Sequence, residues 1–294
     1  MHLTNYPIVN VLEARARLGE GPVWDDQTQR VYWVDIYNHV VHQFTPSTGQ
    51  DRVFKVGEMV SCVALTRSQK LIMTLRHDLA YLDTLTGEVT LIQTVEGDKP
   101  NNRFNDGKCD PQGRFWFGSM SRSLEKGQGT LYRYDPDGSL HIMEKNVTLS
   151  NGLGWSPDQK TFYYTDSPLK IIYAYDYDPP TGNITRRRIF VDLSHAPSYP
   201  DGLTVDAEGC VWSVQWDGWC ILRFAPNGRL IQRVPMPVKR PTSCVFGGKE
   251  GDLLYVTSAS VGLSEPEIQE SFYSGDLFCV RLDVTGLPSN RFGG

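Results

Sequence analysis

The chain has 294 residues, of which 40% are hydrophobic and 21% charged, and its formal net charge is −5. Acidic and basic residues are mixed along it without a basic stripe, which argues against nucleic acid as a partner. No apolar run approaches the ~18 residues of a membrane-spanning helix, and the first fifteen residues lack the apolar core of a signal peptide. We therefore expect a soluble, cytoplasmic protein without a membrane partner.

A strand is expected at residues 8–15, ahead of a pattern that recurs six times. Each copy has a small or polar residue, about four residues of apolar character, a turn, and a strand rich in Tyr, Trp and Val. These strands are expected at 31–36, 71–75, 115–120, 162–166, 211–215 and 254–258. Further strands follow at 40–45, 79–83, 131–135, 172–176, 221–225 and 277–282. A fourth strand closes most copies, for example at 52–54 and 187–191.

A repeat of roughly 40–50 residues with several short strands per unit is typical of a β-propeller. Six units use nearly the whole chain, so we predict an all-β, six-bladed β-propeller that forms one domain over residues 1–294. The last unit has few residues left for an outermost strand. The strand at 8–15 would supply it, which would close the ring and remove exposed sheet edges. No element is assigned to 259–274, which is either a lid or a plain surface loop.

Six cysteines occur without a C-x-x-C pair, and most lie in or beside apolar strands. Because free cysteine is a common small core residue, we expect reduced structural thiols, which suit a reducing cytoplasm. His39 and His42, three residues apart in a hairpin, are expected at the surface. No histidine stands at the start of a repeat, which argues against a His-based catalytic triad.

The first residue of each repeat would face the central channel if the units are blades around one axis. These anchor residues are Glu20, Ser61, Asn105, Asn151, Asp201 and Thr242. Carboxylates and carboxamides aimed at one channel repel or stay unpaired unless a cation or water joins them. Glu20, Asn151 and Asp201 form the best ligand set, and their oxygens suit Ca²⁺, Mg²⁺ or Mn²⁺, with Zn²⁺ also compatible. Alternatively, each is a turn former, since Asn and Asp before Gly are common in turns.

Other polar residues lie close to these anchors. Arg103 precedes Asn105 by two positions, so an alternating strand would point both side chains the same way, toward a ligand rich in hydroxyl or carbonyl oxygen. The alternative for Arg103 is an ion pair with a surface acid. Asp106 and Asp166 could support the ligands from behind, or hydrogen-bond within a turn or between blades.

Five motifs resemble those of the gluconolactonase, regucalcin and luciferin-regenerating-enzyme family: LGEGPVWD, RFNDGKCDPQGRFWFGSM, SNGLGWSPD, YPDGLTVDAEG and RPTSCVFGG. The resemblance runs from about residue 13 to the C-terminal GLPSNRFGG. It implies a six-bladed propeller with one divalent metal ion in the channel, held by Glu20, Asn151 and Asp201. It also implies substrate contacts from Arg103 and Asn105, and an acid/base role for Asp201.

The chain departs from this family at one place. Some animal members have a glutamate just after the strand that here ends in GSM, where this chain has Ser121 and Arg122. The sugar preference is therefore open. Arg122 is a further candidate substrate contact, and an arginine there could favour a substrate that carries negative charge.

The family activity implies metal-dependent hydrolysis of a small sugar lactone, such as glucono-1,5-lactone, to the open-chain acid. Two alternatives stay open: a calcium-binding regulatory protein without turnover, and a lactonase of wider range that resembles the paraoxonases. We expect a monomer or a weak homo-oligomer.

Overall fold

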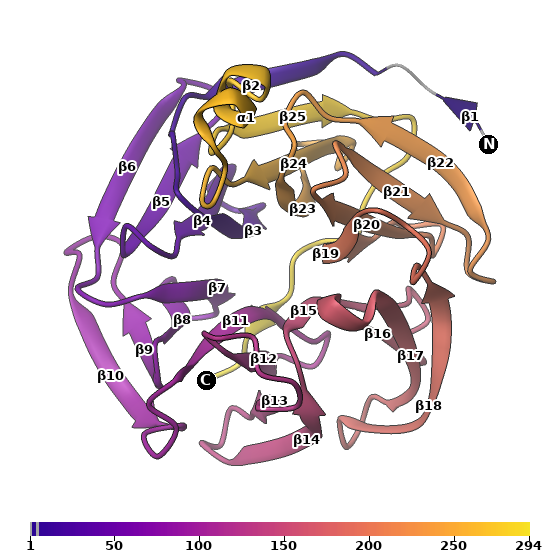
Figure 1. Ribbon diagram of the computed structural model, residues 1–294. Helices are drawn as coiled ribbons and strands as arrows, with labels where there is room; N and C mark the ends of the chain where they lie inside the picture. The colour runs from indigo at the N-terminus through magenta and orange to yellow at the C-terminus, as the bar shows by residue number, and fades with distance from the viewer. Residues whose placement is uncertain (1, 4–5) are drawn as a thin grey trace.

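A computed structural model describes residues 2–3 and 6–294 of the chain. Within this part, six small antiparallel sheets stand around a central axis, as Figure 1 shows, and form a six-bladed β-propeller. The predicted fold class is therefore confirmed. No helix in the described part of the chain has the length and apolar character of a membrane span.

Each blade has four strands in sequence order from the axis outward, except the last, whose outer strand comes from the start of the chain. Blade 1 contains β3 (Gly19–Asp25), β4 (Arg30–Asp35), β5 (Val40–Thr45) and β6 (Gln50–Lys55); blade 2 contains β7 (Val60–Thr66), β8 (Leu71–Leu75), β9 (Asp78–Leu82) and β10 (Val89–Thr94); blade 3 contains β11 (Asn102–Cys109), β12 (Phe115–Ser121), β13 (Gly129–Tyr134) and β14 (Leu140–Val147). Blade 4 contains β15 (Ser150–Trp155), β16 (Thr161–Asp166), β17 (Ile171–Asp178) and β18 (Asn183–Asp192); blade 5 contains β19 (Tyr199–Val205), β20 (Val211–Trp216), β21 (Cys220–Phe224) and β22 (Leu230–Pro235); blade 6 contains β23 (Pro241–Gly247), β24 (Leu253–Ser258), β25 (Leu277–Arg281) and β2 (Ile8–Leu12).

The two ends of the chain tie the ring together. β2 pairs antiparallel with β25, so the predicted closure by the N-terminal strand is confirmed. β1 (His2–Leu3) pairs parallel with β22 of blade 5. After blade 6 the chain crosses the middle of the ring, yellow in Figure 1, and β26 (Arg291–Phe292) pairs parallel with β7 of blade 2.

The core lies between the blades, where apolar faces of neighbouring sheets meet. Trp33, Trp116 and Trp212 are among its largest fully buried side chains. All six cysteines are free, five of them buried and Cys279 half-buried, as expected for structural thiols.

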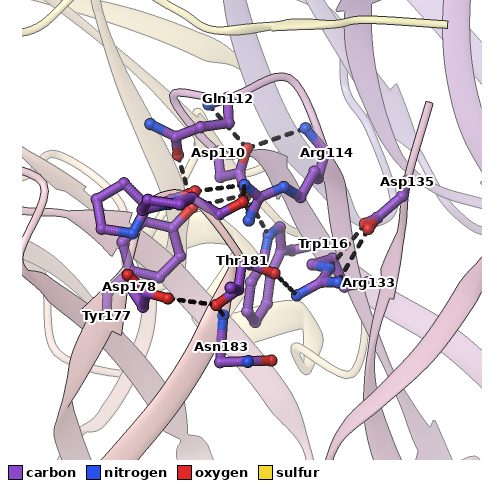
Figure 2. A network of polar contacts seen from close by, with 12 residues as sticks. Asp110, Gln112, Arg114, Trp116, Arg133, Asp135, Tyr177, Asp178, Thr181 and Asn183 are labelled. Carbon is purple, nitrogen blue, oxygen red and sulfur yellow. Dashed lines mark hydrogen bonds and ion pairs between the residues drawn. The ribbon is translucent and has the colours of Figure 1, made fainter. Parts of the chain in front are cut away.

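One repeated turn explains how the sequence spacing sets the blade geometry. In the DPQG turn of blade 3, shown in Figure 2, Asp110 accepts the backbone N–H of Arg114 and the indole N–H of Trp116 at 3.0 Å. Its Oδ2 also accepts the Tyr177 hydroxyl of blade 4 at 2.7 Å. Asp206 in the DAEG turn of blade 5 repeats the pattern with Trp212. The aspartate thus joins the turn to the next strand and, in blade 3, to the next blade.

The expected surface position of His42 is wrong. Its side chain is 7% exposed, stacks on Trp33 with ring centroids 3.9 Å apart, and places Nδ1 2.7 Å from Asp51 Oδ2. His39, in the β4–β5 turn, is half-buried. Both faces of a blade are covered by its neighbours, so alternation along β5 leaves neither face in solvent.

Residues 259–274, unassigned from sequence, contain the short helix α1 (Glu265–Glu270). Ser264 and Glu267 form a capping box at its start. Lys239 pairs with Glu267, and the Ser271 hydroxyl accepts the Lys239 backbone N–H at 2.8 Å. These contacts attach the helix to the segment before β23.

Candidate functional site

The six anchor residues coincide with irregularities in the six inner strands. In every blade the pairing of the first strand with the second shifts register at the anchor, for example between Glu20 and Val23, between Asn151 and Leu153, and between Pro200 and Leu203. Such bulges re-aim a side chain that a regular strand would direct into the sheet. The glycines after these anchors permit close backbone approach, since a Cβ on Gly152 would lie 2.7 Å from the Asp201 carbonyl oxygen.

Three buried carboxylates share the channel at this level: Glu20, Asp106 and Asp201, which are 5%, 5% and 4% exposed. Burial, followed by the charge of Asp106, raises the pKa of Glu20 to about 8. Burial and the charges of Glu20 and Asp106 raise the pKa of Asp201 well above its ordinary value. Asp201 Oδ1 is buried without a hydrogen-bond partner among the described residues, which is costly for a carboxylate unless a cation binds it.

The two asparagine anchors are joined directly. Asn105 Nδ2 donates to Asn151 Oδ1 at 2.7 Å and to the Ser150 carbonyl at 2.8 Å. Asn151 Nδ2 donates to Ser167 Oγ at 2.8 Å, and this hydroxyl donates to the Pro200 carbonyl at 2.6 Å. These bonds orient Asn151 Oδ1, which keeps a second lone pair for another ligand.

Arg103 is buried beside Asn105, as the alternation of the strand predicted. Its Nη1 donates to Asn105 Oδ1 at 2.7 Å and to the Phe104 carbonyl at 2.8 Å. Burial lowers the pKa of Arg103, an effect that the neighbouring Tyr37 and Glu20 oppose. The alternative of a surface ion pair is wrong, because its partners in the described chain are neutral oxygens inside the channel.

Two residues that sequence reasoning missed complete the surroundings. Lys108 Nζ donates to the Leu203 carbonyl at 2.9 Å. Burial lowers the pKa of Lys108, and the nearby carboxylate of Asp106 partly opposes this effect. Three residues after the anchor, the other units have Val23, Ala64, Gly154, Thr204 and Val245. Aligning the repeats would have shown Lys108 as the one charge at this level. Tyr37 follows the second strand of blade 1 and carried no such signal.

Asp106 makes the hydrogen bonds within its turn and toward the next blade that were considered for it. It accepts the Gly107 N–H at 2.8 Å and interacts with the Gly152 N–H of the next blade, while its charge acts on Glu20 and Asp201. Asp166 has a turn role, since it accepts the N–H groups of Thr148 and Leu149.

The remaining anchors differ from these. Thr242 donates to the Gly19 carbonyl at 2.6 Å, so its hydroxyl is used between blades. Ser61 Oγ is buried without a hydrogen-bond partner among the described residues.

A second acidic cluster lies away from the anchors and consists of Asp206, Glu208 and Cys210. The Arg223 guanidinium binds both Asp206 and Glu208, so this cluster is a structural turn in which an arginine offsets the negative charge.

The donor set fits a divalent cation of the oxygen-binding class. Glu20 and Asp201 supply carboxylate oxygens, Asn151 supplies an oriented amide oxygen, and the orphaned Asp201 Oδ1 lacks any other partner. Histidine and thiolate ligands are absent from this group, which favours hard cations such as Ca²⁺, Mg²⁺ or Mn²⁺.

The other end of the channel is covered by the C-terminal segment. Asn290 Nδ2 donates to the Cys109 carbonyl at 3.1 Å, and Arg291 pairs with Asp25 and Asp26. These partners lie where the inner strands end, whereas the anchors lie where they begin. Access to the carboxylates is therefore expected from the anchor side.

Comparison with known proteins identifies the family of this chain. The model of the SMP-30/Gluconolactonase/LRE-like region matches residues 18–260. The chain belongs to this family. It is 42% identical to regucalcin of Gallus gallus over 287 residues, which are 95% of this chain and 96% of that protein. The resemblance inferred from the motifs is thus confirmed.

Two further relatives add detail. The chain is 34% identical to a Bacillus subtilis (strain 168) protein named "Putative sugar lactone lactonase YvrE", over 97% of this chain and 98% of that protein. The structure of this chain superposes on that of a calcium-binding protein, regucalcin, from Agrobacterium tumefaciens str. C58 with a TM-score of 0.96. Those two chains are 28% identical, and 99% of each is covered.

Proposed function

We propose that this protein hydrolyses a sugar lactone to its open-chain acid with the help of one divalent cation bound by Glu20, Asn151 and Asp201. The observation that carries the proposal is the orphaned oxygen of Asp201 within a group of buried, mutually repelling carboxylates. Family membership and the relative named for lactonase activity indicate the reaction class.

The cation, when bound, would supply Lewis-acid stabilisation of the negative charge that develops on the lactone carbonyl oxygen. Residues of the chain would carry out the proton transfers. Asp201 would accept a proton from the water that attacks the carbonyl carbon. As the bond between the carbonyl carbon and the ring oxygen breaks, Asp201 would return the proton to that oxygen. One water is consumed and one hydroxy acid formed.

Arg103 and Asn105 would orient the hydroxyl groups of the sugar. Asn105 is itself held by Arg103 and Asn151, so its position depends on both neighbours. Arg122, exposed beyond Arg103, would contact the outer part of the substrate.

A pH-stat assay with glucono-1,5-lactone tests the proposal. Acid release above the spontaneous rate is expected with a divalent ion, and its loss is expected on chelation and in Asp201→Ala. Lys126→Ala, an exposed substitution on the β12–β13 loop, serves as a control that retains activity. No acid release above background with any divalent ion and any of several aldonolactones would overturn the proposal.

A calcium-binding role without turnover is the second candidate, because a relative of similar structure is described as a calcium-binding protein. Calorimetric binding of Ca²⁺ without lactone hydrolysis would favour it. We further propose that residues 1–294 act as one domain, monomeric or weakly self-associating, in the cytoplasm. The pairing of β2 with β25 supports the single domain.

A further inference from the structure

Arg122 lies on the same side of blade 3 as Arg103. In the pairing of β11 with β12, Arg103 stands opposite Met120, and the Arg122 backbone N–H continues the ladder by donating to the Asn101 carbonyl at 2.9 Å. Side chains alternate along both strands, so Met120 and Arg122 share the face of Arg103. Arg122 is then its diagonal neighbour, at a spacing that long side chains bridge.

Neither guanidinium group forms an ion pair with a carboxylate in the described part of the chain. Arg103 makes hydrogen bonds to an amide and a carbonyl oxygen, and Arg122 is exposed, without an ion pair or side-chain hydrogen bond among the described residues. Burial lowers the pKa of Arg103 and the charge of Arg122 adds to this effect, as expected for like charges at close range.

A third arginine stands beside this pair. Arg17, also exposed, lies over the Tyr37 ring with its guanidinium carbon 5.5 Å from the ring centroid, and Tyr37 adjoins Arg103. Arg17 forms no ion pair within the described residues either. Two exposed arginines, Arg17 and Arg122, thus lie near the buried Arg103.

The deeper channel does not neutralise this charge once a cation is bound. The carboxylates of Glu20, Asp106 and Asp201 are partly balanced by Lys108 and Arg103. A divalent cation would more than cancel the remaining negative charge. Arg122 forms no ion pair among the described residues, so an anionic group of the substrate can pair with it.

We propose that the lactone this protein prefers carries an anionic group, and that Arg122, with Arg103 beneath it, binds that group. This inference rests on the proposed function and narrows its substrate class from neutral sugar lactones to lactones of acidic sugars. An oxyanion with two or more oxygen atoms suits the planar donor face of an arginine, and both carboxylate and phosphate ester satisfy this.

Matched lactones test the inference. The ratio of kcat/KM for an anionic over a neutral lactone is measured with glucaro-1,4-lactone against glucono-1,4-lactone, and with 6-phosphoglucono-1,5-lactone against glucono-1,5-lactone. The wild-type ratio is expected to exceed ~10 for at least one pair, and Arg122→Ala is expected to lower that ratio on the order of 10- to 100-fold. The pair that responds identifies carboxylate or phosphate as the recognised group.

Three further measurements sharpen the test. Arg122→Glu should lower the ratio more than Arg122→Ala, and Arg122→Lys should retain part of it. Added salt should lower kcat/KM for the anionic lactone more than for the neutral one. The reason is that dissolved ions weaken the attraction between exposed charges, whose range is only about 8–10 Å at physiological ionic strength. Lys126→Ala removes a positive charge from the same loop and should leave the ratio unchanged.

The outcomes separate this inference from the proposed function. If lactones are hydrolysed but the ratio is the same in wild type and Arg122→Ala, the inference is wrong and the lactonase function stands. If no lactone is hydrolysed, the lactonase function is wrong, and calorimetry then measures lactone binding directly. If the wild type binds the anionic lactone more tightly than the neutral one and Arg122→Ala abolishes this difference, the binding role of Arg122 is supported. If the wild type and Arg122→Ala bind the anionic lactone equally tightly, that role is wrong.

Discussion

Raising the pH should destabilise the cation-free protein through Glu20. Its pKa is about 8 in the folded state against an ordinary value of 4.5, and the first cause is burial. The folded state therefore binds the extra proton between these values, and stability falls as pH rises through this window. The full window corresponds to roughly 5 kcal/mol of unfolding free energy. Asp201, whose pKa is also raised, acts in the same direction.

Urea unfolding in EDTA at intervals from pH 5 to pH 9 measures this loss. Glu20→Gln keeps the shape of the side chain without its charge and should remove much of the slope. A saturating divalent cation should restore stability at pH 8, since ligands that bind only the folded state stabilise it. Equal stability of the cation-free wild type at pH 5.5 and pH 8, or an unchanged slope in Glu20→Gln, would refute the reasoning.

Four further substitutions test single parts of the site. Asp201→Asn should lower kcat by about 10²–10⁴ through loss of the general base, yet raise the Tm in EDTA, because burial and the neighbouring carboxylates disfavour the ionised Asp201 and an amide cannot ionise; a lower Tm would contradict this account. Arg103→Lys should raise KM for a sugar lactone by about tenfold, because an ammonium group cannot replace the fixed pair of N–H donors of the guanidinium; an unchanged KM would show that Arg103 does not contact substrate. Lys108→Met should cost on the order of 1–3 kcal/mol in urea unfolding, because the Leu203 carbonyl loses its donor and the buried Asp106 loses a nearby positive charge, and Asp106→Asn in the same chain should recover part of the loss. Gly202→Ala should cost about 1–3 kcal/mol in the same assay, because a Cβ there would lie 2.7 Å from the backbone of the next blade, and full stability would mean that the blades can separate.

The repeat explains why so much of the fold could be predicted. Each unit is an antiparallel meander with short connections, so local turn chemistry determines most of its pairing. The DPQG and DAEG turns show this directly, because Asp110 and Asp206 bind the backbone of their own turn and the tryptophan six residues later. The closing strand could be predicted because the last unit lacked an outer strand.

Where prediction failed, contacts between blades were the reason. His42 was placed at the surface because the hairpin pattern does not show that its ring stacks on Trp33, which belongs to a core cluster shared with blade 6. Helix α1 is too short to produce a periodic signal, although Ser264 and Glu267 of its capping box stand in the sequence at the spacing typical of a helix start. The C-terminal segment has no strand pattern, and its path across the channel depends on partners such as Cys109 and Asp25.

By itself, the sequence determined the number of blades, the order of their strands and the positions of Glu20, Asn151 and Asp201 in equivalent places of the repeat. Only the tertiary structure decided that Asp106 raises the pKa of Glu20, that both raise the pKa of Asp201, that the charge of Asp106 acts on Lys108, and that Arg122 lies beside Arg103 without an ion pair among the described residues. The physical reason is that a repeat encodes local pairing and spacing. Burial and the interaction of charges depend on side chains from different blades, which meet only when the ring closes.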